Sequence, residues 1–194
     1  LMAFEREQLL EGFYTTVAWP FTSGPATLRR RHYPISWNKI HMRPFLESLR
    51  LAGIAPRIID AVYRDLDKHV ARQIPQLLER NATALYAYED GAFESFTAAK
   101  FQGLRTIYDL PIGHYEAAQA IFKDEARLEP DWASTLTGLN DSEEKLDRKS
   151  AELSLADHVV AASSFTAKTL EGRLRPDQQL SVTPYGTTPG LPFP

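Results

Sequence analysis

The chain has 194 residues, of which 43% are hydrophobic and 24% are charged, and its formal net charge is -3. This composition is typical of a folded globular protein, and no global basic field favours nucleic acid as a partner. The absence of cysteine excludes disulfides, thiolate metal sites and a cysteine nucleophile, and it fits a reducing compartment. No apolar run approaches the roughly 18 residues that a membrane-spanning helix needs.

The N-terminal segment predicts a helix over residues 2–11 and a strand over residues 13–17. Residues 19–34 contain proline, glycine and serine without a regular period, which predicts a loop. This loop carries the basic tract Arg29-Arg30-Arg31-His32. The tract is either a solvated run of charge or a contact for a phosphate or an anionic membrane surface.

Two helices are expected next. Pro44 suits the first position of a helix that ends at Gly53. Apolar residues then recur every three or four positions from Ile58 to Leu77, the clearest amphipathic pattern in the chain. Pro75 is expected to kink this helix or to end its first segment.

The second half of the chain alternates short apolar runs with helical patterns, which is the rhythm of a parallel sheet. Val159 to Ala162 is a β-branched run followed by a hydroxyl cluster, the signature of a buried strand that leads into a capped helix. The predicted strands are residues 84–88, 105–108, 159–162 and 180–183, and the predicted helices are 90–103, 114–128, 142–155 and 165–174. A looser helical region is expected between residues 130 and 138.

These elements predict an α/β fold with a Rossmann-like open, mainly parallel sheet of about five strands and helices on both faces. We expect one domain over residues 1–186. A helix precedes the first predicted strand, so a strand and its turn are expected to be missing upstream. Residues 187–194 hold three prolines and one glycine, which is typical of a linker to a further domain.

No glycine-rich dinucleotide fingerprint, phosphate-binding loop, serine-hydrolase elbow or zinc-binding histidine pattern is present, so no cofactor and no metal are expected. The candidate site residues are therefore identified by their positions in the predicted sheet. Asp90, Asp109, His114 and Ser163 lie at or just beyond the carboxyl ends of predicted strands, where this architecture builds its sites.

Each candidate has a structural alternative. His114 and Asp109 are the candidate catalytic residues, because a histidine or a carboxylate there could deprotonate an acceptor hydroxyl. His114 could equally be a packing residue. Asp90 can instead cap the helix that follows it, and Ser163 or Ser164 can cap theirs, although the same N–H groups could hold an anion.

Four segments resemble a known family. They are Tyr88-Glu89-Asp90-Gly91-Ala92, Ile107-Tyr108-Asp109-Leu110-Pro111-Ile112-Gly113-His114-Tyr115, Leu155-Ala156-Asp157-His158-Val159-Val160-Ala161-Ala162-Ser163-Ser164-Phe165-Thr166 and Val182-Thr183-Pro184-Tyr185-Gly186-Thr187. In this order they resemble the N-terminal domain of a group 1 (family 4, GT4-like) glycosyltransferase with the GT-B fold. The resemblance covers roughly residues 84–190. The family's glycine-rich first turn and its C-terminal donor domain are not in this sequence.

The resemblance implies a retaining transfer of a sugar from a nucleotide-sugar donor to an acceptor hydroxyl, without a metal. It places the N-terminal domain on the acceptor side of a cleft. Carried over by residue, Ser163, Ser164, Tyr185 and Gly186 would face the donor. Asp90, Asp109 and His114 would lie toward the acceptor. Since most donor-binding groups are absent, we expect the isolated 194-residue chain to have little or no transferase activity.

The alternative function is a non-catalytic binding or scaffold module, either a degenerate transferase half or one subunit of a heteromeric transferase. The expected partners are a nucleotide sugar, a sugar, lipid or other hydroxyl acceptor, and a donor domain in the same chain or in a separate subunit. We expect a cytoplasmic location, with peripheral membrane contact through Arg29 to Arg31. The sequence does not specify the donor sugar, its nucleotide, the acceptor or the oligomeric state.

Overall fold

The computed structural model describes residues 1–186, and these form two compact units. Unit 1 consists of residues 1–85 and 90–105, and unit 2 consists of residues 86–89 together with the chain from residue 106 onward. The single domain expected over residues 1–186 thus contains two units, described separately below. The expected linker at residues 187–194 lies outside the described residues.

Unit 1 is mainly helical and has a small parallel sheet. It contains α1 (Met2–Arg6), β1 (Phe13–Thr15), α2 (Ala26–Arg29), the 3-10 turn η1 (Trp37–Lys39), β2 (Ile40–Met42), α3 (Pro44–Leu51), α4 (Ile59–Glu79) and α5 (Phe93–Phe101). β1 pairs with β2 in parallel, with Phe13 opposite Ile40 and Thr15 opposite Met42. The sequence did not predict β2. A strand of three residues is too short to show an alternation of apolar and polar side chains, and it is recognised only by its pairing with β1.

The core of unit 1 lies between α4 and α5. Ile74, Leu77, Ala99 and Leu104 form a buried cluster, with Leu78, Leu85 and Tyr14 among the residues packed around it. Pro75 does not end α4, which continues to Glu79. The proline is exposed, while its neighbour Ile74 is fully buried. Burial of the apolar stripe therefore holds the helix together across the hydrogen bond that a proline removes.

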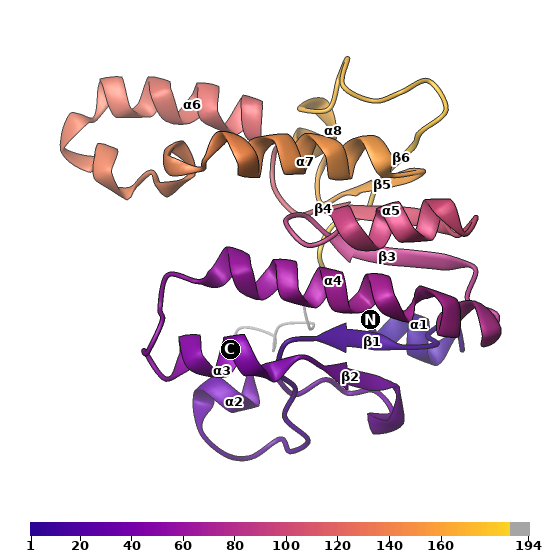
Figure 1. The fold of residues 1–194 in the computed structure, drawn as a ribbon. Helices are drawn as coiled ribbons and strands as arrows, with labels where there is room; N and C mark the ends of the chain where they lie inside the picture. Colours follow the sequence, from indigo (N-terminus) through magenta and orange to yellow (C-terminus); the bar gives the residue numbers. More distant parts are fainter. Residues whose placement is uncertain (187–194) are drawn as a thin grey trace, which may run out of the picture. The chain divides into compact units, whose positions relative to one another are not determined.

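Unit 2 is built on a parallel sheet. It contains most of β3 (Ala84–Tyr88) and β4 (Arg105–Leu110), then α6 (Tyr115–Leu128), the 3-10 turns η2 (Pro130–Thr135) and η3 (Thr137–Asn140), α7 (Glu143–Leu155), β5 (His158–Ala161), α8 (Ser164–Lys168) and β6 (Gln179–Val182). The strand order is β3-β4-β5-β6, which can be followed in Figure 1. Both β4–β5 and β5–β6 pair in parallel, with Asp109 opposite Val160 and Val160 opposite Ser181.

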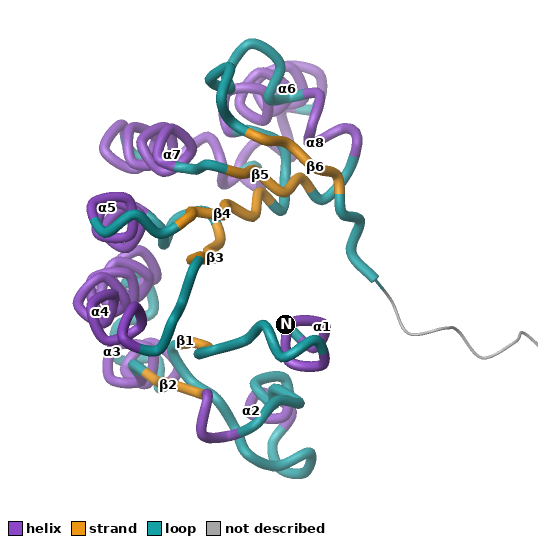
Figure 2. The backbone as a smooth tube through the Cα atoms, turned by 90° about the vertical axis from the view of Figure 1, so that its right-hand side faces the viewer, coloured by secondary structure: helices purple, strands orange, loops and turns teal. Residues whose placement is uncertain are grey.

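The fold class is the predicted one, α/β with an open parallel sheet, but the helices of unit 2 lie on one face of that sheet rather than on both. Each connection moves one strand further in the same direction, and such connections are almost always right-handed. The helices α6, α7 and α8 therefore collect on the same face, as Figure 2 shows. The buried side chains of Tyr108, Val159 and Ala161 belong to this packed sheet.

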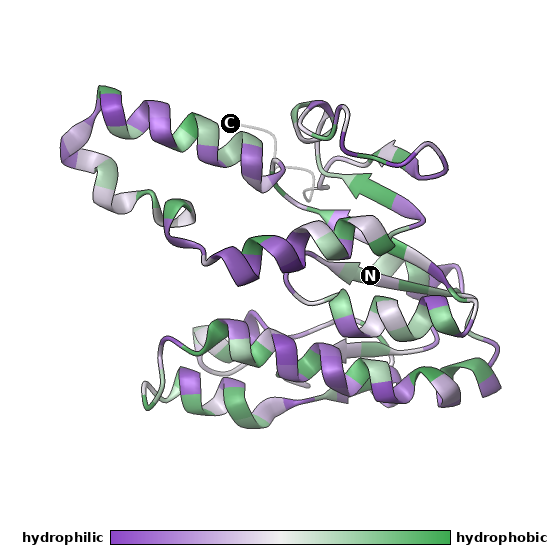
Figure 3. Cartoon of the chain, turned by 45° about the horizontal axis from the view of Figure 1, so that its top comes forward, coloured by the Kyte–Doolittle hydropathy of each residue, from purple (hydrophilic) through white to green (hydrophobic). Residues whose placement is uncertain are grey.

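The α7 helix shows how polar residues enter this core. Its first turns are strongly hydrophilic (Figure 3). Yet Lys149 and Glu152 are buried. The Lys149 ammonium lies 3.3 Å from the Glu89 carboxylate and 3.6 Å from that of Asp141, and the Glu152 carboxylate lies 3.3 Å from Arg148. The charges are paired, as burial requires.

Candidate functional site

Three side chains from β3 and β4 meet on the face of the sheet opposite the helices. The Tyr108 hydroxyl contacts Glu152 of α7 at 3.4 Å, which places Tyr108 on the helix-covered face. Successive side chains of a strand alternate, so Asp109 points to the other face. There the Tyr86 hydroxyl donates to the Asp109 carboxylate at 2.6 Å. Tyr88, two residues after Tyr86, lies on the same side of β3.

The Asp109 carboxylate also affects the pKa of a third tyrosine, Tyr185. Burial raises the pKa of the Tyr86 hydroxyl, and so do its hydrogen bond to Asp109 and the charge of that carboxylate. Burial and the Asp109 charge also raise the pKa of Tyr88 and of Tyr185, which follows β6. All three phenols therefore keep their protons at neutral pH. We call Tyr86, Tyr88, Asp109 and Tyr185 the tyrosine–aspartate cluster.

The cluster combines one shielded carboxylate with exposed aromatic rings. Asp109 is 4% exposed, whereas Tyr88 is 56% and Tyr185 is 60% exposed. The rings of Tyr86 and Tyr88 meet edge to face, with centroids 6.3 Å apart. A carboxylate accepts hydrogen bonds from hydroxyl groups, phenol hydroxyls donate and accept them, and exposed aromatic faces pack against apolar C–H surfaces. This combination suits a ligand that is rich in hydroxyl groups.

His114 lies elsewhere and has a structural role. It is the N-cap of α6, and its Nδ1 accepts a hydrogen bond from the Glu116 backbone at 3.4 Å. The residue is 6% exposed, and its ring lies against Tyr115. Burial lowers the pKa of the imidazole, and the nearby Arg173 lowers it further. The neutral ring needed for the cap is therefore the favoured form.

Ser163 and Ser164 open α8 and differ in their surroundings. Ser163 is the N-cap, and its hydroxyl accepts from the Thr166 backbone at 3.0 Å. Ser164 is exposed. The structure also links Ser163 to His114, because the His114 backbone donates to Thr169 Oγ1, which in turn donates to the Thr166 carbonyl. The carboxyl ends of β4 and β5 are thus joined by side-chain and backbone hydrogen bonds.

Asp90 follows β3 in a turn, at a positive φ of 72°. It does not cap α5 as the sequence analysis allowed. That role belongs to Asp67 of α4, which is 1% exposed and accepts from the backbone N–H groups of Glu94 at 2.8 Å and Ser95 at 2.9 Å. The helix terminus is satisfied by a carboxylate from a neighbouring helix, which no local motif could indicate.

The predicted site residues therefore divide into groups. Asp109 and Tyr185 share the tyrosine–aspartate cluster, while His114 and Ser163 share the hydrogen-bonded chain through Thr169. Gly186 is exposed beside Tyr185. Sequence reasoning missed Tyr86 and Tyr88. Their two-residue spacing in a predicted strand places both rings on one face, which is the signal that could have found them.

Among residues 1–186, no group of three or more metal-ligating side chains is present. Within the same residues, no helix combines the length and the apolar character needed to cross a bilayer. No family model matches the chain, and neither a curated protein nor a solved structure shows significant similarity to it.

Proposed function

We propose that this chain is the acceptor-side domain of a retaining, nucleotide-sugar-dependent glycosyltransferase, and that the tyrosine–aspartate cluster holds the acceptor. The observation that carries the proposal is the hydrogen bond from Tyr86 to Asp109, which lies next to the carboxyl end of β4 in an open parallel sheet. In sheets of this kind, ligands bind beyond the carboxyl ends of the strands. The sequence resemblance to the GT-B family is the second support.

The cluster supplies the contacts that a hydroxyl-bearing acceptor needs. The Asp109 carboxylate accepts a hydrogen bond from the reacting hydroxyl and orients its oxygen, and it is the candidate to receive the proton when the new bond forms. The exposed rings of Tyr88 and Tyr185 pack against the C–H face of a sugar ring. The raised pKa values of these tyrosines keep them as hydrogen-bond donors.

The donor side of the proposal rests on the residues after β5 and β6. Ser163 uses its hydroxyl to cap α8, so the exposed Ser164 is the better candidate for a donor contact, together with Tyr185 and Gly186. The remaining donor contacts belong to a further domain of the same protein or to a separate subunit. No metal and no cofactor enter this proposal.

One observation favours the second candidate function, a non-catalytic binding module. His114, one of the two candidate catalytic residues, is buried and holds the start of α6. This leaves Asp109 as the candidate for proton transfer. If Asp109 serves only to bind, the same cluster would make the chain a carbohydrate-binding subunit of a larger transferase.

Peripheral membrane contact through the basic tract is part of the proposal. Arg29 and Arg30 are exposed, whereas Arg31 pairs with the buried Glu47 at 2.5 Å. Only Arg29 and Arg30 should therefore contribute to a lipid surface. This is tested by sedimentation of the wild type, Arg29→Glu and Arg30→Glu with anionic vesicles. If the variants bind the vesicles as well as the wild type does, the proposed membrane contact is wrong.

The function is tested by binding of a panel of mono- and disaccharides to the 194-residue chain, measured by saturation-transfer NMR and calorimetry. We expect a member of the panel to bind, and Asp109→Asn to weaken it at least tenfold. The control is Asp131→Asn, the same change at an exposed residue of η2, which should bind like the wild type. The proposal would be contradicted if Asp109→Asn bound saccharides as tightly as the wild type, or if no member of the panel bound.

Catalysis is tested separately, by following transfer from UDP-, GDP- and ADP-sugars to the best-bound saccharide with the protein that includes its donor domain or subunit. Transfer that Asp109→Asn abolishes supports the enzyme. Tight acceptor binding without transfer from any of these donors supports the binding module. Steady transfer by the 194-residue chain alone would contradict the expectation that it lacks most donor contacts.

A further inference from the structure

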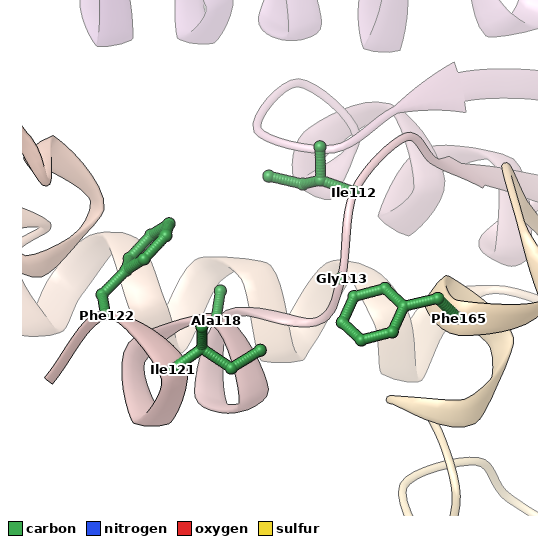
Figure 4. Close-up of a pocket in the computed structure, with 6 residues that line it drawn as sticks. All are labelled: Ile112, Gly113, Ala118, Ile121, Phe122 and Phe165. Atoms are coloured by element: carbon green, nitrogen blue, oxygen red, sulfur yellow. The ribbon is translucent and has the colours of Figure 1, made fainter. Parts of the chain in front are cut away.

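An apolar depression lies over the connection from β4 to α6 in unit 2. It has a volume of about 210 Å³ and is lined by Ile112, Gly113, Ala118, Ile121, Phe122 and Phe165. Figure 4 shows Phe122 and Phe165 on opposite sides of it, with Ile112 on one edge and Ala118 and Ile121 on the other. Every lining residue is apolar, so the depression offers a ligand contact surface but no hydrogen-bonding side chain.

Two glycines hold the aromatic walls in place. A Cβ atom on Gly113 would lie 3.3 Å from the Phe165 ring, and one on Gly138 of η3 would lie 2.8 Å from the Phe122 ring. Each ring therefore packs directly against backbone. A Cβ atom at Gly113 would require a small adjustment of the Phe165 ring, and one at Gly138 would displace the Phe122 ring. The backbone at the two glycines thus forms part of the surface against which the aromatic rings pack.

Its lining is costly to leave in water. Ile112 is 58% exposed and Phe165 is 56% exposed, and Ile121 is also exposed. Covering such surface gains about 25 cal/mol for each Å² that leaves water. An apolar cavity of about 150 Å³ is large enough to bind benzene. By comparison, the depression has room for one aromatic ring with a small substituent or for a short alkyl chain.

The position of the depression connects it with the tyrosine–aspartate cluster. Asp109 is the penultimate residue of β4, and Ile112 and Gly113 follow in the connection to α6. Phe165 belongs to α8, immediately after β5. The depression is therefore built from the segments that leave the carboxyl ends of β4 and β5, which is the edge where ligands of an open parallel sheet bind.

We propose that this depression binds the apolar portion of the acceptor, a single aromatic ring or a short alkyl chain, at the same carboxyl edge of the sheet as Asp109 of the tyrosine–aspartate cluster. This inference rests on the proposed function for the identity of the ligand as an acceptor. It makes the acceptor an amphipathic molecule with a hydroxyl group on or near an apolar group, instead of a purely polar saccharide.

The test uses 4-nitrophenol as the apolar probe and glycerol as the polar one, each titrated into the 194-residue chain and followed by calorimetry and saturation-transfer NMR. We expect 4-nitrophenol to bind at least tenfold more tightly than glycerol. Ala118→Phe places a ring in the depression from within α6 and should reduce 4-nitrophenol binding at least tenfold. Ala120→Phe, the same change at an exposed position of the same helix, should leave it unaltered.

The outcomes separate this inference from the proposed function. If 4-nitrophenol binds and Ala118→Phe blocks it while saccharides fail to bind, the depression stands as an apolar site and the transferase proposal falls. If saccharides bind through Asp109 but 4-nitrophenol does not bind, the apolar subsite is refuted and the proposed function stands. If the wild type self-associates in light scattering and Ala118→Phe abolishes this, a second copy covers the depression and the inference is overturned.

Discussion

The Tyr86 hydroxyl donates a hydrogen bond to the Asp109 carboxylate across 2.6 Å, joining the middle of β3 to the penultimate residue of β4. Asp109 is 4% exposed, so hydrogen-bond donors of this kind replace the water that burial removes from its carboxylate. The pair both stabilises the end of the sheet and sets the geometry of the candidate site. Its removal should therefore affect the free energy of unfolding and ligand binding together.

The change Tyr86→Phe removes this donor and keeps the ring. We expect it to lower the free energy of unfolding by about 2 kcal/mol, since a hydrogen bond to a charged group is worth about 1.5–3 kcal/mol. Urea denaturation followed by circular dichroism measures the loss. Tyr63→Phe, the same change at an exposed tyrosine of α4, should cost less than about 0.5 kcal/mol. Equal losses in the two variants would contradict the assigned bond.

The cap that Asp67 provides for α5 should be among the more costly contacts to remove in unit 1. Asp67→Ala leaves two backbone N–H groups of the buried helix start without their acceptor. We expect a loss of about 2–4 kcal/mol, and a smaller loss for Asp67→Asn, whose amide oxygen still accepts. Asp60→Ala, at an exposed position of the same helix, is the control. A thermal or urea midpoint unchanged in Asp67→Ala would rule the cap out.

Ser163 and Ser164 can be separated by the same substitution. Ser163→Ala should cost about 1 kcal/mol, because its hydroxyl accepts from the Thr166 backbone at the start of α8. Ser164→Ala should change stability by less than about 0.5 kcal/mol, because the residue is exposed. Urea denaturation of both variants decides this. If Ser164 serves the donor, as proposed, its variant should instead weaken donor-sugar binding in the protein with its donor domain.

The buried ammonium of Lys149 should be intolerant of removal. Lys149→Met leaves the Glu89 carboxylate, also largely buried, without the ammonium group that lies 3.3 Å from it. Breaking one side of a buried ion pair typically costs about 3–5 kcal/mol. The double variant Lys149→Met/Glu89→Gln should recover part of this loss, and Lys123→Met on exposed α6 surface should have little effect. A double variant no more stable than Lys149→Met would show that the charge of Glu89 is not the source of the cost.

Stability should fall as the pH is lowered from 6.5 toward 5. Burial lowers the pKa of both His69 and His114 below the ordinary value of 6.5. Below that pH the unfolded chain binds protons that the folded chain does not, so the equilibrium shifts toward unfolding, by at most about 1.4 kcal/mol per pH unit for each histidine. Urea denaturation at pH 7.5, 6.5 and 5.5 measures this slope.

The variant His69→Gln/His114→Asn should flatten the slope, since Asn is itself a good N-cap and neither replacement titrates. A slope that is unaltered in this variant would place the titration elsewhere. Below about pH 4.5 a second loss is expected. Two arginines, Arg50 first, lower the pKa of Glu47, and the hydrogen bonds from Lys39 and Ser36 lower that of Glu5 to about 2. Protonation of these carboxylates then removes the stability that their pairs contribute.

The amino-acid pattern alone determined the α/β class and most element positions in the second half of the chain. The predicted strand at residues 84–88 matches β3, and the predicted helices at 114–128 and 142–155 differ from α6 and α7 by one residue at the start. Runs of apolar residues between glycines, prolines and helix caps are local signals. They predict the elements correctly because the apolar faces of these helices and strands are the ones that pack in the tertiary structure.

Tertiary structure decided the contacts between residues that are distant in sequence. Asp67 caps a helix that begins 26 positions later, and Tyr86 meets Asp109 only because β3 and β4 are neighbours in the sheet. The polar groups at a strand or helix end accept any suitable partner, and nothing in the local sequence selects among them. The sequence thus indicated the carboxyl edge of the sheet as the place of the candidate site. Which side chains meet there is determined by the tertiary packing.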